Sequence, residues 1–171
     1  THDDIWQQLK HTYPHSIIAG CSTAGEIFDD MVDDESISCA VVAFEQTSLR
    51  FASTDVSNKA GQLLAEQLNH PSLSAVLVLS DGLTINGSEL VDGLISGLDS
   101  KVIITGRLAA DGANFGDTWT LVDGQPKQRK VTAVGFYGDA VKVSFGSKGG
   151  WDLFGPERLV TKSTNNIVYE L

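Results

Sequence analysis

Cysteine is scarce in this sequence: among 171 residues there are only two, Cys21 and Cys39. Neither belongs to a Cys-x-x-Cys pair, and this spacing excludes a zinc ribbon or a thioredoxin-like redox centre. Both lie in or beside apolar segments. We therefore expect two reduced thiols in a cytoplasmic protein. A disulfide between them is the alternative.

Long apolar runs and basic residues are also lacking. No stretch approaches the roughly 18 apolar residues that a membrane-spanning helix needs, and the first ten residues, THDDIWQQLK, lack the basic and apolar parts of a signal peptide. Lysine and arginine number 12 against 22 aspartates and glutamates, which gives a net charge of −10. A duplex nucleic-acid binder needs a basic face. We expect neither nucleic acid nor a membrane as a partner.

The chain is long enough for one sizeable domain, and its 42% hydrophobic and 20% charged residues are ordinary for a globular protein. Apolar periodicity predicts three helices and several short strands. In the second helix Leu63, Leu64 and Leu68 form the apolar face. In the third, Ser88 is the expected N-cap, and its apolar stripe is Leu90, Val91, Leu94, Ile95 and Leu98. The expected helices are 3–13, 60–68 and 88–98; the expected strands are 16–20, 38–44, 48–53, 74–79, 101–105 and 140–145, with a hairpin of 118–122 and 131–137 around Asp123-Gly124.

An internal repeat relates two parts of the chain. A helix leads to SIIAGCSTAGEIF (16–28), SCAVVAF (38–44) and SLRFAS (48–53); another leads to KVIITGRLAADGANF (101–115), VTAVGFY (131–137) and AVKVSF (140–145). Gly20 matches Gly106, Ala24 matches Ala110, and Phe44 matches Phe136. We place repeat 1 at about 1–57, repeat 2 at about 74–151, and a closing segment at 152–171.

These elements predict a mixed α/β (α+β) domain of layered sheets and flanking helices, built from the two pseudo-symmetric repeats. The strand 74–79 precedes the second copy, whereas no equivalent strand precedes the first. We therefore expect a single domain that is truncated at its ends. The two glycine-bearing loops are expected at equivalent strand ends, with a ligand pocket between them.

Three stretches resemble the N-terminal part of the FIST sensory domain. They are GCSTAGEI (20–27), TGRLAADGANF (105–115) and GPERLVTKSTNNIVYEL (155–171), in that order and spacing. The family favours two adjacent glycines where this chain has Thr105-Gly106, and a small residue where it has Arg107. The resemblance implies a small-molecule sensor without assigned catalytic activity, for which amino acids are proposed ligands; a subset called NosP binds haem and senses nitric oxide. It also implies a C-terminal FIST domain and a signalling output, such as a histidine kinase, a chemoreceptor or a cyclic-dinucleotide enzyme, as partners.

The stretch GCSTAGE (20–26) supports three hypotheses. As a nucleophile, Cys21 would need a nearby base, and the nearest histidine in sequence, His15, lies about 17–20 Å away along an extended strand. As a structural residue, Cys21 would simply be buried at a strand end. As part of a binding loop, it would neighbour Ser22, Thr23 and backbone N–H groups, and Gly20 and Gly25 would allow close approach to a ligand.

Charged residues on the matching loop suit a free amino acid. Arg107 would bind a carboxylate with two parallel hydrogen bonds, and Asp111 or Glu26 would hold an ammonium group; the alternative is a salt bridge between these side chains. Asn114 and Phe115 would supply an amide and an apolar wall, although Phe115 also suits core packing. Ser80 and Asp81 end a strand and would reach the same pocket, or Asp81 would cap its own turn.

Haem is the remaining alternative, because it needs an axial ligand such as histidine, cysteine or methionine. The candidates are His11, His15, His70, Cys21 and Met31, none of which stands in a recognisable haem signature. The sequence therefore predicts a non-enzymatic sensory domain that binds a small molecule such as an amino acid, with no cofactor and no metal. A haem-based nitric oxide sensor and a hydrolase using Cys21 are the two alternatives.

Overall fold

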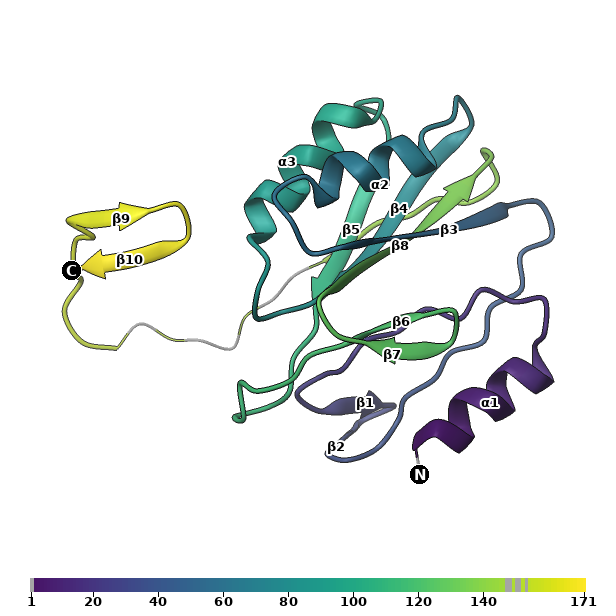
Figure 1. The fold of residues 1–171 in the computed structure, drawn as a ribbon, viewed down its shortest axis with the longest axis horizontal. Helices are drawn as coiled ribbons and strands as arrows, with labels where there is room; N and C mark the ends of the chain where they lie inside the picture. Colours follow the sequence, from purple (N-terminus) through teal and green to yellow (C-terminus); the bar gives the residue numbers. More distant parts are fainter. Residues whose placement is uncertain (1, 147–148, 150–151, 153) are drawn as a thin grey trace.

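A four-stranded sheet with two helices on one face forms the centre of the molecule (Figure 1). The computed structural model describes residues 2–146, 149, 152 and 154–171. The strand order is β3–β8–β4–β5, where β3 is Ser48–Asp55, β8 is Lys130–Tyr137, β4 is Leu73–Ser80 and β5 is Ile103–Leu108. The predicted mixed α/β fold class is confirmed.

Strand β8 joins the sheet together, because it pairs on both sides. It runs antiparallel to β3, from Ser48 opposite Tyr137 to Asp55 opposite Lys130. It is also antiparallel to β4, with Val78 opposite Ala133. Strands β4 and β5 are parallel, a pairing that requires a crossover between them. Helix α3 (Gly87–Gly97) makes that crossover.

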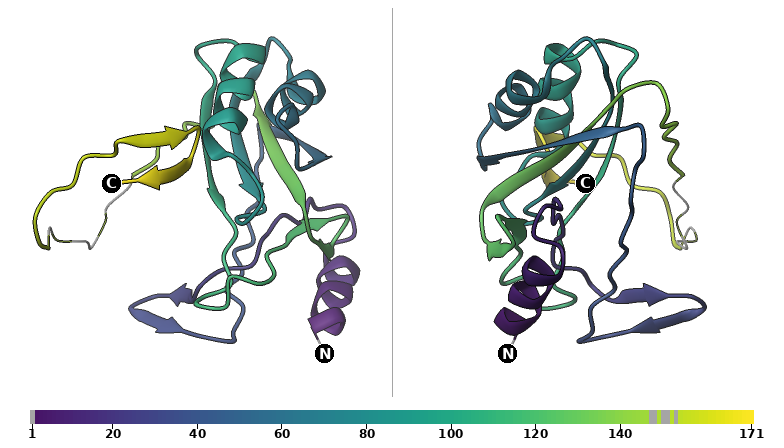
Figure 2. Two further views of the ribbon diagram at one scale, coloured as in Figure 1. Left: turned by 60° about the vertical axis from the view of Figure 1, so that its left-hand side comes forward. Right: turned by 90° about the vertical axis from the view of Figure 1, so that its right-hand side faces the viewer.

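Helices α2 (Ala60–Leu68) and α3 lie side by side on one face of the sheet (Figure 2). Their leucines at helical spacing meet the alternating apolar side chains of the strands. Burial of this surface is the main stabilising contribution to the fold. The core consists of residues from both helices, from the C-cap of α3 and from β3, β4 and β8: Ala52, Ala60, Leu64, Ala65, Leu68, Leu73, Val76, Val78, Leu90, Leu94, Leu98, Val131, Ala133 and Tyr137.

Smaller elements surround this centre. Helix α1 (His2–Thr12) is held by Trp6, whose ring packs edge-to-face on Trp119 with centroids 5.9 Å apart. Three two-stranded hairpins complete the described chain: β1 (Glu26–Phe28) with β2 (Met31–Asp33), β6 (Thr120–Val122) with β7 (Gln125–Lys127), and β9 (Lys162–Thr164) with β10 (Ile167–Glu170). No helix within the described ranges has the length and apolar character needed to cross a membrane.

The expectation that 16–20, 38–44 and 140–145 are strands is wrong for this structure. Residues 16–20 lead only to an isolated bridge between Cys21 and Thr120, and 38–44 and 140–145 belong to no ladder. A strand needs a neighbour for its N–H and C=O groups. Within the described part of the chain, 38–44 and 140–145 pair with no strand, and 16–20 bonds to the segment 119–121 only through its last residue, Gly20. The side chains of Val41 and Val42 are accordingly 63% and 65% exposed.

Three local expectations are also corrected. The turn at Asp123-Gly124 joins β6 to β7 rather than to 131–137, because β8 has longer partners in β3 and β4. Helix α3 is capped by Asn86, whose side chain accepts hydrogen bonds from the N–H groups of Ser88 and Glu89, and not by Ser88. The apolar stripes are narrower than expected: Leu63, Val91 and Ile95 are exposed.

The two-repeat organisation and the truncated ends stay predictions. The second copy places β5 and β8 in the sheet, whereas only the last segment of the first copy, within β3, is a strand of that sheet. The predicted boundary between repeat 2 and the closing segment falls partly on 147–148, 150–151 and 153, which lie outside the described residues.

The crossing of α2 and α3 yields a stability prediction. A Cβ at Gly61 would lie 2.2 Å from the backbone oxygen of Leu90, whereas one at Gly87 would meet nothing within 4 Å. We expect Gly61→Ala to lower the free energy of unfolding by about 1–3 kcal/mol, because the helices must separate. Urea denaturation would measure this change. Gly87→Ala is the matched control and should leave stability unchanged or slightly raised; equal effects of the two would contradict the close crossing.

Candidate functional site

The first glycine-bearing loop begins with Gly20, Cys21 and Ser22. Its backbone and the Ser22 side chain form hydrogen bonds with the chain that follows β5. The Ser22 carbonyl accepts a hydrogen bond from the N–H of Ala110 at 3.0 Å, and its N–H donates to the Trp119 carbonyl at 3.0 Å. The hydroxyl of Ser22 accepts from the N–H of Trp119 at 3.1 Å, and the Gly20 carbonyl accepts from Leu121 at 2.9 Å. The polar groups of this loop therefore join the two loops to each other.

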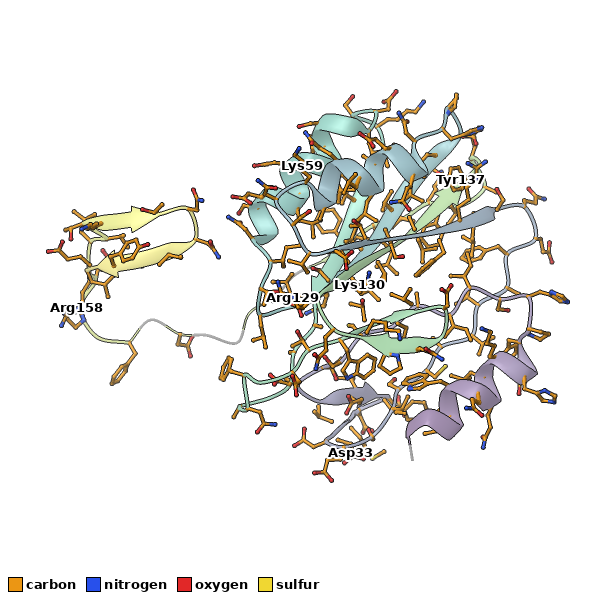
Figure 3. The ribbon with its side chains drawn as sticks, in the orientation of Figure 1. Asp33, Lys59, Arg129, Lys130, Tyr137 and Arg158 are labelled. Atoms are coloured by element: carbon orange, nitrogen blue, oxygen red, sulfur yellow. The ribbon has the colours of Figure 1, made fainter. Side chains whose placement is uncertain are left out.

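Ser80 and Asp81 meet the same segment at the end of β4. The N–H of Ala109 donates to the Ser80 carbonyl at 2.7 Å. The α-carbon of Gly82 lies so near that a Cβ there would be 1.8 Å from the Ala109 oxygen. The N–H of Asp81 donates to the carbonyl of Lys130 at 3.0 Å, and Figure 3 labels Lys130 where β8 begins. Parallel strands β4 and β5 thus end at one edge of the sheet, where both loops gather.

Asp81 is only 3% exposed, and both oxygens of its carboxylate accept hydrogen bonds. One oxygen accepts hydrogen bonds from the N–H of Leu83 at 3.1 Å and from the N–H and hydroxyl of Thr84, both at 2.8 Å. The other accepts from the hydroxyl of Thr118 at 2.9 Å. Burial alone would raise the pKa of Asp81, but these hydrogen bonds outweigh it and lower the pKa below its usual value. Asp81 is therefore an ionised anchor of the loops.

The second half of GCSTAGE contacts its own hairpin. The hydroxyl of Thr23 donates to the carboxylate of Glu26, and the hydroxyl of Ser36 approaches the other Glu26 oxygen at 3.5 Å. Gly25 has φ +137°, a conformation that favours glycine. Thr23, Gly25 and Glu26 thus shape the start of β1, whereas Gly20, Cys21 and Ser22 lie against 119–121.

Asp111 organises the loop of residues 111–117. Its carboxylate accepts hydrogen bonds from the N–H groups of Asp117 at 2.9 Å and Gly116 at 2.6 Å, and these bonds lower the pKa of Asp111. The N–H of Asn114 donates a hydrogen bond to the carbonyl of Asp111 at 3.4 Å. Phe115 is 76% exposed, so it does not pack in the core.

Arg107 and Ser80 border a groove between α3 and β5. The groove has a volume of about 560 Å³. Arg107 is exposed on the edge strand and, among the described residues, forms no ion pair with Glu26 or Asp111. The walls are mainly apolar and come from β4, α3 and β5: Val78, Ser80, Gly87, Leu90, Val91, Leu94, Ile95, Leu98, Asp99, Ser100, Val102, Ile104, Thr105, Gly106, Arg107 and Leu108.

Cys21 lacks the features of an activated nucleophile. Burial raises the pKa of its thiol, which disfavours the reactive thiolate. His15 lies exposed in the turn that follows α1. Both cysteines are free, so the disulfide alternative is wrong for this structure.

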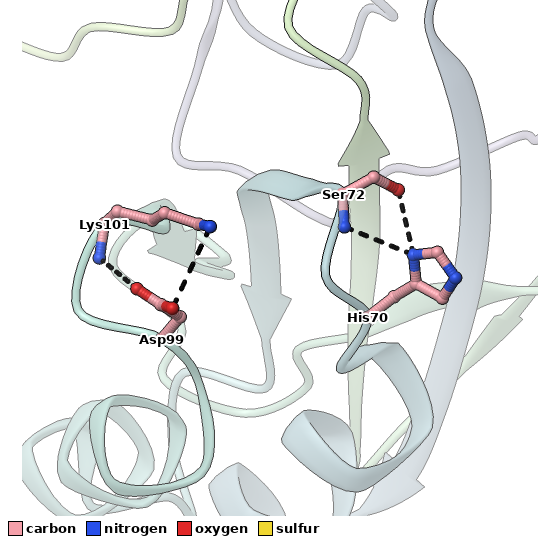
Figure 4. A network of polar contacts seen from close by, with 4 residues as sticks. All are labelled: His70, Ser72, Asp99 and Lys101. Atoms are coloured by element: carbon pink, nitrogen blue, oxygen red, sulfur yellow. Dashed lines mark hydrogen bonds and ion pairs between the residues drawn. The ribbon is translucent and has the colours of Figure 1, made fainter.

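The described residues do not fit haem. The groove lining contains no histidine, cysteine, methionine or tyrosine that would serve as an axial ligand. His11, His15 and Met31 are exposed on α1, the following turn and β2. His70 is held elsewhere: its Nδ1 lies 2.8 Å from the hydroxyl of Ser72 (Figure 4), and its ring packs edge-to-face on Tyr137. Across the described ranges, no three His, Cys, Asp or Glu side chains cluster as metal ligands.

The sequence did not single out Thr118 and Thr120, which are the buried polar residues between the loops. The hydroxyl of Thr118 donates to Asp81 and accepts from the N–H of Gly82 at 3.1 Å. Thr120 approaches the Lys130 carbonyl at 3.4 Å. The alternation of Thr118, Trp119 and Thr120 is a visible strand signal, but it does not reveal a partner 37 positions away.

A comparison with protein families places the chain. The family model described as the FIST N domain matches residues 1–171. The chain therefore belongs to the FIST family, whose domains are sensory modules of signal transduction. Membership of a family of sensory domains indicates a non-enzymatic role. No curated protein matches the chain.

The lowered pKa of Asp81 predicts acid sensitivity. A depressed pKa contributes stability above the unfolded-state value of about 3.9 and loses it as the pH falls through the folded-state value. We expect Asp81→Asn to be about 1–3 kcal/mol less stable at pH 7, because an amide replaces the acceptor of Thr118 and Thr84. Its stability should also fall less than that of the unchanged protein between pH 5 and pH 3. Urea titrations at both pH values would test this, with Asp92→Asn on the exposed face of α3 as control; parallel pH curves for Asp81→Asn and the unchanged protein would contradict it.

The state of the two thiols yields another prediction. Cys39 is exposed, whereas Cys21 is half-buried with a raised pKa. We expect iodoacetamide at pH 7.5 to label Cys39 roughly tenfold faster or more in the folded protein, measured by peptide mass spectrometry. The difference should vanish in urea. Faster labelling of Cys21 would contradict this account and favour the hydrolase.

Proposed function

We propose that this domain senses a small carboxylate with an apolar body, such as a free amino acid with an apolar side chain, and that it binds this ligand in the groove between α3 and β5. The observation that carries the proposal is the position of Arg107 at the border of a mainly apolar groove. The domain acts as a non-enzymatic module of a cytoplasmic signalling protein.

Arg107 supplies the recognition of the carboxylate. A guanidinium group presents a rigid fork of donors that matches a carboxylate with two parallel hydrogen bonds. The side chain is exposed, and neither Glu26 nor Asp111 pairs with it, since Glu26 binds Thr23 and Asp111 binds its own loop. Neither of these two acidic residues therefore competes with a ligand for Arg107.

The groove supplies the apolar contact. Its volume of about 560 Å³ falls within the usual range of ligand sites, roughly 300–1,000 Å³. Leu94, Leu98 and Ile104 are among its apolar lining residues. An aliphatic or aromatic side chain would bury its surface there, whereas a short polar one would gain little.

The ammonium group of an amino-acid ligand would contribute less to the binding affinity than its carboxylate does. The acidic residue of the lining is Asp99, whose carboxylate lies 3.9 Å from the amine of Lys101 and accepts the Lys101 N–H at 3.0 Å (Figure 4). Selectivity therefore depends mainly on the carboxylate and the apolar side chain. We propose that the bound state is passed to a C-terminal FIST domain and to an output such as a histidine kinase or a cyclic-dinucleotide enzyme, as the family resemblance implies.

The ligand proposal is tested by thermal melting against a panel of free amino acids, with haemin as one sample. A ligand that binds only the folded state stabilises it by about 2.7 kcal/mol at 100 times its dissociation constant. We expect leucine, isoleucine, valine or phenylalanine to raise the midpoint, and glycine and aspartate not to. Arg107→Ala should weaken binding by roughly 10- to 100-fold, since hydrogen bonds to a charged group contribute about 1.5–3 kcal/mol.

Arg158→Ala is the matched control, because it removes the same charge from a segment that does not line the groove (Figure 3). It should bind as the unchanged protein does. Equal loss in both variants would indicate a non-specific charge effect. A response to haemin alone would overturn the amino-acid proposal and favour the haem sensor.

A further inference from the structure

The hairpin of β1 and β2 presents large apolar side chains on both of its faces. Ile27 lies opposite Val32, and Phe28 lies opposite Met31. Because side chains alternate between the two faces of a strand, each pair occupies a face of its own. All of these side chains are exposed, by 62% to 74%. A two-stranded hairpin is only marginally stable by itself, and exposed apolar surface rimmed by polar residues is typical of an interaction site.

Carboxylates surround these apolar side chains. In residues 26–35, which we call the acidic hairpin, every residue that is not apolar is acidic: Glu26, Asp29, Asp30, Asp33, Asp34 and Glu35. Among the described residues, none of these acids takes part in an ion pair. Both views of Figure 2 show β1 and β2 projecting from the body of the molecule, away from the four-stranded sheet. The acidic hairpin is therefore open to a partner on its apolar faces and along its charged rim.

The pairing within the acidic hairpin leaves a repulsion unrelieved. Glu26 lies directly opposite Asp33, which Figure 3 labels, and like charges in this position destabilise a pair of strands. The hairpin of β9 and β10 also exposes apolar side chains, but there Glu170 lies opposite Lys162. Opposite charges are thus balanced within β9–β10, whereas β1–β2 needs cations from elsewhere.

We infer that the acidic hairpin docks into an apolar groove bordered by lysine and arginine on a partner protein, such as the face of a basic amphipathic helix. The apolar side chains would leave water at the centre of this contact, and the carboxylates would meet the cations at its rim. Cations beside Glu26 and Asp33 would also relieve their repulsion, so binding would stabilise the hairpin itself.

Charge selects this partner over a second copy of the chain and over a membrane. Two copies of this face would bring carboxylates against carboxylates, and each chain has a net charge of −10. In a bilayer, Asp29 and Asp30 would enter first, because they form the turn between Phe28 and Met31. Burial of carboxylates without partners is costly, and anionic lipids would repel them.

A synthetic peptide of leucine and lysine is the probe, with about 18 residues and its leucines at helical spacing on one face. We expect the full chain to bind it, and Phe28→Ser to weaken binding roughly tenfold or more, because less apolar area is buried. Isothermal titration calorimetry would measure both affinities. Phe145→Ser is the matched control, since Phe145 is 72% exposed and Phe28 is 71% exposed. Equal affinities of the three proteins, or no binding of the peptide, would overturn the inference.

The same probe tests the role of charge. Asp29→Asn with Asp30→Asn should weaken binding about threefold or more and reduce its dependence on salt. Asparagine tolerates the φ of +55° at Asp29, so the turn should be kept. Asp92→Asn with Asp139→Asn removes the same charge from exposed positions elsewhere and should have the smaller effect. Equal weakening by the two double variants would show attraction to the net charge alone and would contradict docking at the acidic hairpin.

Two further probes separate docking from its alternatives. A peptide of the same composition, with its leucines dispersed around the helix, should bind at least about tenfold more weakly, because it has no apolar face to bury. Equal binding of both peptides would overturn the apolar contact. Vesicles of phosphatidylcholine should not bind the chain, and binding that Phe28→Ser abolishes would overturn the inference in favour of a membrane.

Amide hydrogen exchange on the chain without substitutions gives a measurement that does not depend on variants. With the amphipathic peptide at saturation, amides within 26–33 should exchange at least about tenfold more slowly than in the free chain. Amides within 162–170, in the other exposed hairpin, should be unaffected and serve as the internal control. Protection elsewhere with none in 26–33 would overturn the docking site.

Discussion

The backbone pairing of β8 on both of its sides is the interaction on which the rest of the structure depends. Without β8, strand β3 would have no neighbour, and β4 would pair only with β5. The side chains of Val131, Ala133 and Tyr137 complete the core beneath α2 and α3. The hydroxyl of Tyr137 also donates to the Leu68 carbonyl at 2.7 Å and so ties the end of α2 to the sheet. Strand β8 thus provides the backbone pairing of the sheet and several of the apolar side chains on which the two helices pack.

The same arrangement decides where the conspicuous loops meet. Strands β4 and β5 are parallel and end together, and β8 begins at that edge, so Asp81, Ala109 and Lys130 become neighbours. Buried polar groups are costly unless they are hydrogen-bonded, and here Thr118 and Ser22 satisfy them. The motif that stands out in the sequence is therefore largely used to hold loops together, while the groove beside Arg107 is built from residues that look like ordinary helix and strand positions.

Local pattern predicted the elements whose stabilising contacts are mostly local. Helix α2 begins and ends as expected, and β4 and α3 lie within a residue of their predicted bounds. The failures have one cause: 16–20 and 38–44 are apolar enough for strands, but strand formation depends on a partner that periodicity does not identify. The partner of β8 was misassigned for the same reason. In the site, Ser80, Asp81 and Ser22 were predicted to bind a ligand from their positions at expected strand ends. The structure shows their hydrogen bonds to neighbouring loops, and a role toward a ligand stays a prediction. Thr118 was missed because its partner is far away in sequence.

The central position of β8 also affects the order of folding. Its pairs with β3 join residues as far apart as Ser48 and Tyr137, so a long loop must close before the sheet gains its second neighbour. A high proportion of such distant contacts slows folding. On the ribosome, β3, α2, β4, α3 and β5 emerge before the strand that fits between β3 and β4. Until residue 137 is released, two unpaired strand edges and the apolar faces of two helices stay open, which makes this interval the one in which the chain most needs protection from aggregation.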